Sequence, residues 1–324
     1  MPSAWLLYNP GAGKFPSQFF AHRAASVLRS SGWNVHLFST ESSHHITQLT
    51  AQAVAEKVDA VLMSGGDGSV NYALRGLIGA KTALGVLPSG TSNVWARELG
   101  LPILTWTRWQ ALEKSAQALT QAEVMKVDVG LCNSIPFLLW AGLGLDGFVA
   151  NRVEPRQRWE RSITVPQYAA LVIWRAAVWH GMNLRVDTDN QKLKGHFLLA
   201  VVSNIRKYAG GLAHLSPQAC LNDGAMDLWL FAGESLGETV RHAYDLWNGR
   251  HVTSTRVHSL PIRRGCIQSE TPIDVQLDGE PAGCASQITI EVLPKALHVL
   301  VPPSASPALF AKPTSDTAGV HVGK

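Results

Sequence analysis

Apolar and polar positions follow two different spacings through the first third of the chain. Apolar runs of strand length occupy residues 4–8, 35–38, 60–63 and 84–87. Between these runs, apolar residues recur at three- and four-residue spacing, which predicts helices near residues 19–28, 46–57 and 70–78. Strands separated by helices of this length form right-handed βαβ units. The pattern therefore predicts a parallel sheet with helices on both faces.

The pattern changes after about residue 122. Runs with the length and composition of strands occupy residues 124–129, 137–141, 197–202, 226–231, 273–277 and 288–292. Two stretches of helical periodicity interrupt them, near residues 167–179 and 236–247. We therefore expect an α/β domain at residues 1–122 and a β-rich domain at 123–301. The remainder, 302–324, is rich in Pro, Ser, Ala and Gly, and we expect it to be disordered.

Composition narrows the class of protein. A chain of 324 residues with 46% hydrophobic and 16% charged residues has ample material for a globular core. The net charge of +4 is mild, and no basic block carries interleaved aromatics in the manner of a nucleic-acid module. The chain enters a predicted strand at Ala4, and its longest apolar stretch, 165–178, is interrupted by Arg175. We therefore expect no nucleic-acid partner, no signal peptide, no transmembrane segment and a cytoplasmic location.

Three of the predicted strands end in turns rich in glycine and hydroxyl residues. In chain order the turns are Asn9-Pro10-Gly11-Ala12-Gly13-Lys14, Gly65-Gly66-Asp67-Gly68-Ser69 and Pro88-Ser89-Gly90-Thr91-Ser92-Asn93. The carboxyl ends of parallel strands share one edge of the sheet, where open α/β folds bind ligands. Glycines can adopt positive φ and let backbone N–H groups approach phosphate, and Ser69 is suited to open a helix whose dipole favours an anion. The second turn therefore predicts a phosphate cradle, with an ordinary strand-to-helix turn as the structural alternative.

The three turns, in this order and at this spacing, resemble the catalytic domain of the diacylglycerol kinase family, which also contains sphingosine kinases, ceramide kinases and bacterial lipid kinases. The resemblance continues at residues 142–146, 215–217, 223–227 and 277–280 and covers nearly the whole chain apart from the tail. It implies an NAD kinase-like α/β domain that binds ATP, followed by a β-sandwich domain for the lipid substrate. The active site is then expected between the two domains.

The resemblance also assigns roles to individual residues. It places ATP contacts at Asn9, Pro10, Gly11, Ala12, Gly13, Thr40, Gly65, Gly66, Asp67, Gly68, Ser69, Val70, Asn71 and Thr91. It implies Glu280 as the base that accepts the proton of the substrate hydroxyl, with Asp278 beside it. Two of these assignments have structural alternatives, since Asp278-Gly279 is also a hairpin signal and Thr40 alone is typical of a helix cap.

Transfer of a phosphoryl group requires a divalent cation to neutralise developing charge. The resemblance implies Mg²⁺ bound by the Asp223 carboxylate and by the backbone carbonyls of Cys220 and Ala225, and such hard oxygen ligands suit that ion. Asp67 is a second catalytic candidate, as a contact of catalytic Mg²⁺ or of the acceptor hydroxyl, and its alternative is a turn or N-cap aspartate. Val94 stands where many family members carry Asp, which leaves the acceptor specificity open.

Residues 152–179 interleave five arginines with four Trp and Tyr residues. Such a segment fits the surface of an anionic membrane, and it equally fits a helix that packs its aromatics between two domains. The sequence as a whole predicts an ATP- and Mg²⁺-dependent kinase that meets its lipid at the membrane surface. An NAD kinase-like enzyme and a non-catalytic lipid or nucleotide sensor remain the alternatives. The acceptor lipid and the oligomeric state are not readable from the sequence.

Overall fold

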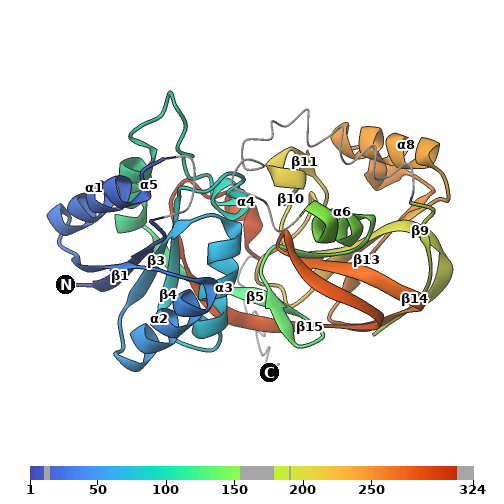
Figure 1. Cartoon of the computed structure of the whole chain (residues 1–324), viewed down its shortest axis with the longest axis horizontal. Coiled ribbons are helices and arrows are strands. Elements are labelled where there is room, and N and C mark those ends of the chain that lie inside the picture. Colours follow the sequence, from blue (N-terminus) through green and yellow to red (C-terminus); the bar gives the residue numbers. More distant parts are fainter. Residues whose placement is uncertain (11–14, 154–178, 190, 312–324) are drawn as a thin grey trace, which may run out of the picture.

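The computed structural model describes residues 1–10, 15–153, 179–189 and 191–311, which form two lobes (Figure 1). The first lobe contains a parallel sheet with the strand order β2-β1-β3-β4. Its strands are β1 (Ser3–Tyr8), β2 (Asn34–Ser39), β3 (Ala60–Gly65) and β4 (Ala83–Pro88). Its helices are α1 (Ser17–Ser30), α2 (Ser43–Ala55), α3 (Asp67–Leu77), α4 (Val94–Glu98) and α5 (Ala111–Thr120).

Alternate residues of these strands contribute to two hydrophobic cores, because neighbouring strand positions point to opposite faces of a sheet. Leu6 and Leu62 pack with α1 and α5 on one face, whereas Leu7 and Met63 pack with α2 and α3 on the other. All four side chains are fully buried. The predicted parallel sheet with helices on both faces is confirmed.

The second lobe consists mainly of antiparallel strands around a core of its own. Its strands are β5 (Glu123–Cys132), β6 (Ile135–Phe137), β7 (Trp140–Gly144), β8 (Met182–Thr188), β9 (Lys192–Ser203), β10 (Lys207–Tyr208), β11 (Ala213–His214), β12 (Met226–Ala232), β13 (Val257–Ile262), β14 (Arg264–Leu277) and β15 (Glu280–Val301). Its helices are α6 (Leu145–Val153) and α8 (Leu236–Trp247), with short 3-10 turns at Ala209–Gly211 and Arg250–Thr253. The predicted β-rich second domain is thus observed. No helix among the described residues is long and apolar enough to cross a membrane.

The strand β15 connects the two lobes. It pairs with β14 and β5 in the second lobe and then reaches β4, where Val299 lies opposite Leu84. Val299 is fully buried in the same core as Leu84. The carboxyl end of the region that we expected to form the second domain therefore lies in the sheet of the first lobe.

The segment after β15 differs from the sequence prediction. We expected disorder from residue 302 onward, but residues 302–311 contact both lobes and contain a 3-10 turn at Pro307–Leu309. Leu309 is buried, and its carbonyl accepts a hydrogen bond of 2.8 Å from the Leu221 N–H. A composition rich in Pro and Ser does not prevent ordering when one apolar side chain reaches a core. Residues 312–324 lie outside the described residues.

The hairpin turn between β14 and β15 holds the lobes together. Asp278 and Gly279 adopt φ values of 54° and 89°, as in the I′ hairpin turn that the Asp-Gly sequence favours. The buried Asp278 carboxylate accepts hydrogen bonds from the backbone N–H groups of residues 138, 139 and 140, at 2.9, 2.7 and 3.1 Å. It also accepts one of 2.7 Å from the side-chain amide of Asn71. Because Asn71 belongs to α3, this carboxylate joins the first lobe to the second.

Burial determines the protonation behaviour of Asp278. Desolvation raises the pKa of its carboxyl group from 3.8 to about 6, although the four N–H donors oppose the shift. The folded protein therefore holds this proton more tightly than the unfolded chain does. The resulting contribution to stability is complete below pH 3.8 and is lost as the pH rises to about 6.

We expect Asp278→Asn to remove this pH dependence, because an amide does not titrate. The free energy of unfolding of the wild type, relative to that of the variant, should fall by about 2–3 kcal/mol as the pH rises from about 4 to about 7. Urea unfolding of both proteins across that range measures it. A difference that stays constant with pH would show that Asp278 does not titrate in the folded state.

Candidate active site

The turn after β3 leads directly into α3. Gly66 is the N-cap, with φ of −100°, and the helix begins at Asp67. Our expectation that Ser69 opens the helix is therefore wrong by two residues. The first-turn N–H groups of an α-helix have no partner within the helix, so this turn presents backbone donors and the positive end of a dipole to the sheet edge. Such an arrangement favours an anion.

The glycines of the turns after β3 and β4 do not adopt positive φ, which corrects the conformational reason given above; close contacts surround Gly65, Gly68 and Gly90 instead. A Cβ atom on Gly90 would overlap the Gly66 Cα, so the turns after β3 and β4 touch each other. A Cβ atom on Gly65 would lie 2.7 Å from the Ser69 Cβ. One on Gly68 would lie 2.5 Å from Oε1 of Glu280. The Gly-Gly-Asp-Gly sequence thus lets three segments approach one point.

Two residues that we expected to contact ATP, Val70 and Asn71, also have contacts inside the protein. The Val70 side chain is buried in the core beneath α3, and its N–H donates to the Gly66 carbonyl at 3.1 Å. Asn71 is also buried, and besides Asp278 its amide donates to the Pro136 carbonyl at 3.2 Å. The last two positions of the matched motif therefore join elements of the fold.

Asp67 caps a neighbouring helix. Its carboxylate accepts hydrogen bonds from the N–H groups of Val94 and Trp95, at 2.9 and 3.0 Å, at the start of α4. Burial raises the pKa of this carboxyl group, and the two N–H donors partly offset that effect. Asp67 is not itself an N-cap residue, since Gly66 is the N-cap of α3 and Asn93 that of α4, but its side chain accepts hydrogen bonds at the start of α4. Each carboxylate oxygen still has a lone pair for a second contact.

The hairpin that carries Asp278 also presents Glu280 to the first turn of α3. Glu280 is half-buried, is the first residue of β15 and lies against Gly68. Gln276 fixes the hairpin, because its Oε1 accepts a hydrogen bond of 2.6 Å from the Gly279 N–H. The Gln276 Nε2 donates to Oδ2 of Asp146 at 2.7 Å. The Glu280 backbone is therefore held from the side of the second lobe.

Sequence reasoning missed this supporting network. Asp146 lies in the first turn of α6, where burial raises the pKa of its carboxyl group while hydrogen bonds from Tyr208, Gln276 and Trp140 lower it. The resemblance included Asp146 in a matching motif but gave it no role. A carboxylate that follows a buried strand and a glycine, as in Gly-Leu-Gly-Leu-Asp, is the signal that marked it. Nothing in the sequence indicated Gln276 or Tyr208 as its partners.

The remaining ATP contacts that we expected are only partly described. Gly11, Ala12 and Gly13 lie outside the described residues, between Pro10, which is exposed, and the start of α1. The Asn9 carbonyl accepts a hydrogen bond of 2.6 Å from the Ser17 hydroxyl. Thr91 is exposed beside Gly90.

Thr40 lies at the end of β2. It is buried, and its N–H donates to the Tyr8 carbonyl at 2.8 Å. The helix-cap alternative for Thr40 is wrong, since Ser42 is the N-cap of α2 and its hydroxyl accepts from the His45 N–H at 3.1 Å. The end of β2 is thereby held beside the end of β1, close to the first glycine-rich turn.

The predicted metal segment lies in the second lobe. Oδ1 of Asp223 accepts a hydrogen bond of 3.1 Å from the Ala225 N–H, and the Cys220 thiol donates to Asn222. Burial raises the pKa of Asp128 and Asp227, and the nearby charge of Asp223 adds to both shifts. Among the described residues, no three His, Cys, Asp or Glu side chains are arranged to hold a metal. Carboxylates that repel one another and adjacent backbone carbonyls nevertheless fit a hard cation such as Mg²⁺.

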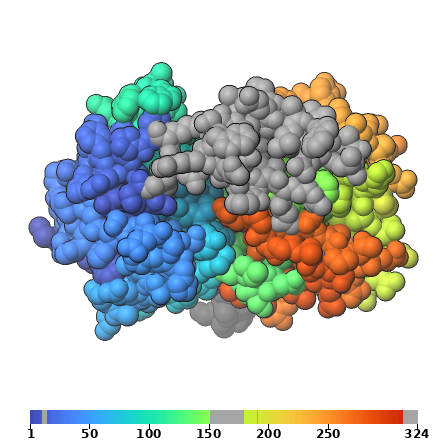
Figure 2. Space-filling view, viewed as in Figure 1, coloured from blue at the N-terminus to red at the C-terminus, as the bar shows by residue number. Residues whose placement is uncertain are grey.

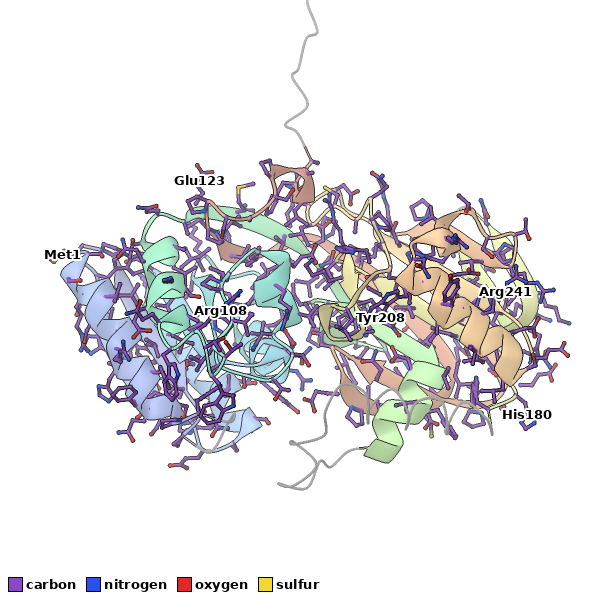
Figure 3. The ribbon with its side chains drawn as sticks, turned by 90° about the horizontal axis from the view of Figure 1, so that it is seen from above. Met1, Arg108, Glu123, His180, Tyr208 and Arg241 are labelled. Atoms are coloured by element: carbon purple, nitrogen blue, oxygen red, sulfur yellow. The ribbon has the colours of Figure 1, made fainter. Side chains whose placement is uncertain are left out.

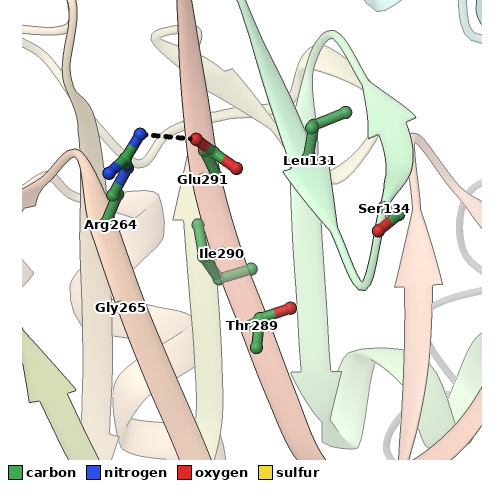
Figure 4. A pocket seen from close by; sticks show the side chains of 7 residues that line it. All are labelled: Leu131, Ser134, Arg264, Gly265, Thr289, Ile290 and Glu291. Atoms are coloured by element: carbon green, nitrogen blue, oxygen red, sulfur yellow. Dashed lines mark hydrogen bonds and ion pairs between the residues drawn. The ribbon is translucent and has the colours of Figure 1, made fainter.

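Two other features lie apart from this site. Most of the basic segment 152–179 is outside the described residues, but Trp179 packs against Phe148 and its indole N–H donates to the Leu198 carbonyl at 2.8 Å. A pocket of about 330 Å³ contains none of the predicted site residues (Figure 4). It is lined by Leu131, Ser134, Arg264, Gly265, Thr289, Ile290 and Glu291. The ion pair between Arg264 and Glu291, 2.9 Å long, lies at that pocket.

Comparison with known proteins places the fold and the glycine-rich turns in one family. Residues 3–132 match the model of the diacylglycerol kinase catalytic domain. Residues 141–301 match the model of the YegS C-terminal NAD kinase beta sandwich-like domain. A crystal structure of a diacylglycerol kinase from Bacillus anthracis superposes with a TM-score of 0.71 at 21% identity, covering 94% of this chain and 98% of that one. The two-lobed fold is therefore shared with that protein.

Alignments with bacterial kinases cover almost the full chain. A diacylglycerol kinase of Mycobacterium tuberculosis is 30% identical over 303 residues, which cover 91% of this chain and 94% of the relative. A diacylglycerol kinase of Bacillus subtilis is 25% identical over 317 residues, covering 93% and 97%. A probable lipid kinase YegS of Salmonella typhimurium is 27% identical over 311 residues, with the same coverage. This chain belongs to the diacylglycerol kinase family.

Proposed function

We propose that this kinase transfers the γ-phosphoryl group of ATP to the hydroxyl group of a lipid, with Glu280 as the base. The observation that carries the proposal is the contact between Glu280 and Gly68. It brings a carboxylate of the second lobe to the first turn of a helix whose N-terminus favours phosphate. A phosphate site and a proton acceptor are the two groups that such a transfer needs close together.

The turns after β1, β3 and β4 would hold the phosphates of ATP. In this proposal the N–H groups at the start of α3 face the phosphate oxygens, and the absence of side chains at Gly66 and Gly90 leaves the backbone accessible. Asn9, Pro10, Thr40 and Thr91 border the same edge. Asp67 fixes α4 and the loop before it, so it positions the cradle through its contacts with Val94 and Trp95.

Glu280 would accept the proton of the lipid hydroxyl as its oxygen attacks the γ-phosphorus and ADP leaves. The carboxylate needs a fixed position for this task, because a displacement of about 1 Å can cost a factor of 100 in rate. Gln276 and the Asp278-Gly279 turn supply that position, since both ends of the turn are hydrogen-bonded. We assign Gln276 and Asp146 as positioning residues.

Asp223, with the carbonyls of Cys220 and Ala225, would hold Mg²⁺ in the second lobe. A bound divalent cation supplies positive charge and fixes oxygen ligands. The chemistry of the donors supports such a site, because burial and, to a smaller extent, the charge of Asp223 raise the pKa of Asp128 and Asp227, and a cation would relieve the repulsion between these carboxylates. We further propose that the enzyme is cytoplasmic and meets its lipid at the membrane surface.

Gly66→Val tests the phosphate cradle. The first added carbon would lie at an ordinary contact distance of 3.4 Å from the Gly90 Cα, so the two methyl groups of valine beyond it would occupy the space that this proposal gives to phosphate. We expect the affinity for ATP to fall by at least about tenfold, measured by calorimetric titration, while circular dichroism shows a folded protein. Gly237→Ala is a matched control, because a Cβ atom there meets only the Ser235 hydroxyl at 4.0 Å. Unchanged ATP affinity in folded Gly66→Val would remove the cradle from this proposal.

Glu280→Gln tests the base, because it keeps the shape of the side chain but cannot take up the proton. We expect turnover on dispersed diacylglycerol to fall by roughly 10²- to 10⁴-fold with little change in the KM for ATP. Glu291→Gln makes the same chemical change on the same strand, at the pocket of Figure 4, and should retain normal turnover. If Glu280→Gln retained turnover near that of wild type, Glu280 would not be the base, and the Asp278-Gly279 turn would have only the role of a hairpin.

Gln276→Leu tests positioning. It removes the bond to the Gly279 N–H and the bond to Asp146, so we expect a fall in turnover of about tenfold with an unchanged KM for ATP. If Gln276 acts through Glu280, adding Gln276→Leu to Glu280→Gln should lower turnover little further. Gln287→Leu, at an exposed position of β15, is the control. Additive losses in the double variant would assign Gln276 a separate role.

A further inference from the structure

A cluster of five aromatic side chains lies at one end of the first lobe. It consists of Phe15, Phe19, Phe20, Trp106 and Trp109. Ring centroids of Phe15 lie 4.9 Å from Trp106 and 5.8 Å from Trp109. Phe19, Trp106 and Trp109 are nevertheless 52%, 67% and 44% exposed. This aromatic cluster therefore presents a contiguous apolar surface to the solvent.

A second apolar surface runs along α8. Leu236, Val240, Tyr244 and Trp247 recur at four-, four- and three-residue spacing, so they share one face of the helix. Their exposed fractions are 37%, 48%, 58% and 66%. The opposite face already packs on the second lobe through the buried residues His242 and Leu246. We call these exposed residues the α8 stripe, since an amphipathic helix normally shows solvent only its polar face.

The two surfaces lie along the same edge of the molecule. In Figures 1 and 2 the loop before α5 is at the top of the first lobe, and α8 is at the top of the second. Figure 3 looks onto this edge and shows Arg108 over one lobe and Arg241 over the other. Phe15 directly follows the glycine-rich turn at 9–14, so the aromatic cluster adjoins the proposed phosphate site.

We propose that the aromatic cluster and the α8 stripe together form a docking face for the surface of an anionic lipid bilayer. The inference builds on the proposed function, because it says how the kinase would meet a lipid. Two apolar patches on different lobes but on one edge fit a broad, flat partner better than a small one. Trp and Tyr are the side chains that favour the interface between bilayer and water.

The charges along this edge agree with an anionic surface. The carboxylates of α8 are paired, Glu238 with Arg256 and Asp245 with Arg241 at 3.7 Å. In the first lobe, Glu113 pairs with Arg23. Arg108 lies between the two exposed tryptophans in the sequence, and Arg250 follows the α8 stripe, and both are exposed. Three carboxylates near the patches are thus paired with arginines, Glu234 just before α8 is exposed, and exposed cations remain beside each apolar patch.

Substitution of the exposed aromatics tests the docking face. One variant carries Trp106→Ser and Trp109→Ser, a second carries Tyr244→Ser and Trp247→Ser, and a third combines all four changes. We expect co-sedimentation with vesicles of phosphatidylglycerol and phosphatidylcholine to fall at least about fivefold in each pair and to vanish in the combined variant. Control changes at exposed apolar positions elsewhere, Val124→Ser and Ile135→Ser, should bind vesicles like wild type.

Charge is tested separately with Arg108 and Arg250, because both side chains are exposed. Arg108→Gln with Arg250→Gln should lower vesicle binding and flatten its dependence on salt, since salt screens exposed charges. Vesicle binding of the combined aromatic variant equal to that of wild type would overturn the proposal. So would a concentration-dependent dimer that the same changes dissociate in sedimentation velocity, because the occupant would then be a second copy of the chain.

Activity on detergent-dispersed diacylglycerol separates this inference from the proposed function. Retained activity in the combined variant, together with lost activity on vesicle-borne lipid, is the expected result. Equal loss in both assays would mean that these residues support the fold, which overturns the docking face. If wild type phosphorylates no lipid but binds vesicles through these residues, the docking face holds and the proposed function fails.

Discussion

The buried carboxylate of Asp278 is the contact on which the rest of the arrangement depends. It accepts hydrogen bonds from Asn71 on α3 and from backbone N–H groups just before and at the start of β7, so one side chain fixes two lobes. A carboxylate without these donors would be costly to bury, because desolvation penalises its charge. The buried Asp278 also fixes the position of Glu280, two residues further on, against Gly68 in the first turn of α3. Geometry at the candidate site therefore depends on a contact that is itself inaccessible to substrate.

A second polar connection runs through the short helix α4. Asp67 caps its amino end, and Glu98 at its carboxyl end accepts from the N–H groups of Arg206 and Lys207, at 3.4 and 3.1 Å. Burial raises the pKa of both carboxyl groups. Five residues of helix would be unstable alone, since helix nucleation is unfavourable. Anchors at both ends give α4 its stability and connect the glycine-rich turn of the first lobe to β10 of the second.

How far the sequence predicts this structure depends on the range of the interactions involved. Strand and helix periodicity located β1 to β4 and the helices α1, α2 and α3, because each of these elements buries a continuous apolar face, whereas α4 and α5 were not predicted. Local turn chemistry also predicted the Asp278-Gly279 hairpin. Long-range contacts were not readable in the same way. No local pattern indicates that Asn71 bonds to a residue more than 200 positions away, that Asp67 caps a helix 27 residues later, or that Leu309 packs beneath Leu221.

The glycines of the turns after β3 and β4 also show that a sequence motif does not reveal the contacts that require it. Their positions in the turns are visible in the sequence, which led us to expect positive φ and a close approach of the backbone to phosphate; the structure shows no positive φ at Gly65, Gly66 or Gly68. Gly66, Gly68 and Gly90 avoid the positive φ region and instead leave room for one another and for Glu280. A side chain at Gly68 would meet the Glu280 carboxylate before it met any phosphate, so this glycine serves the contact between lobes first. A motif that suggests a nucleotide loop in sequence is, in the structure, also the surface on which the second lobe positions its carboxylate. The proposed phosphate site and the contact between the lobes therefore involve the same glycines.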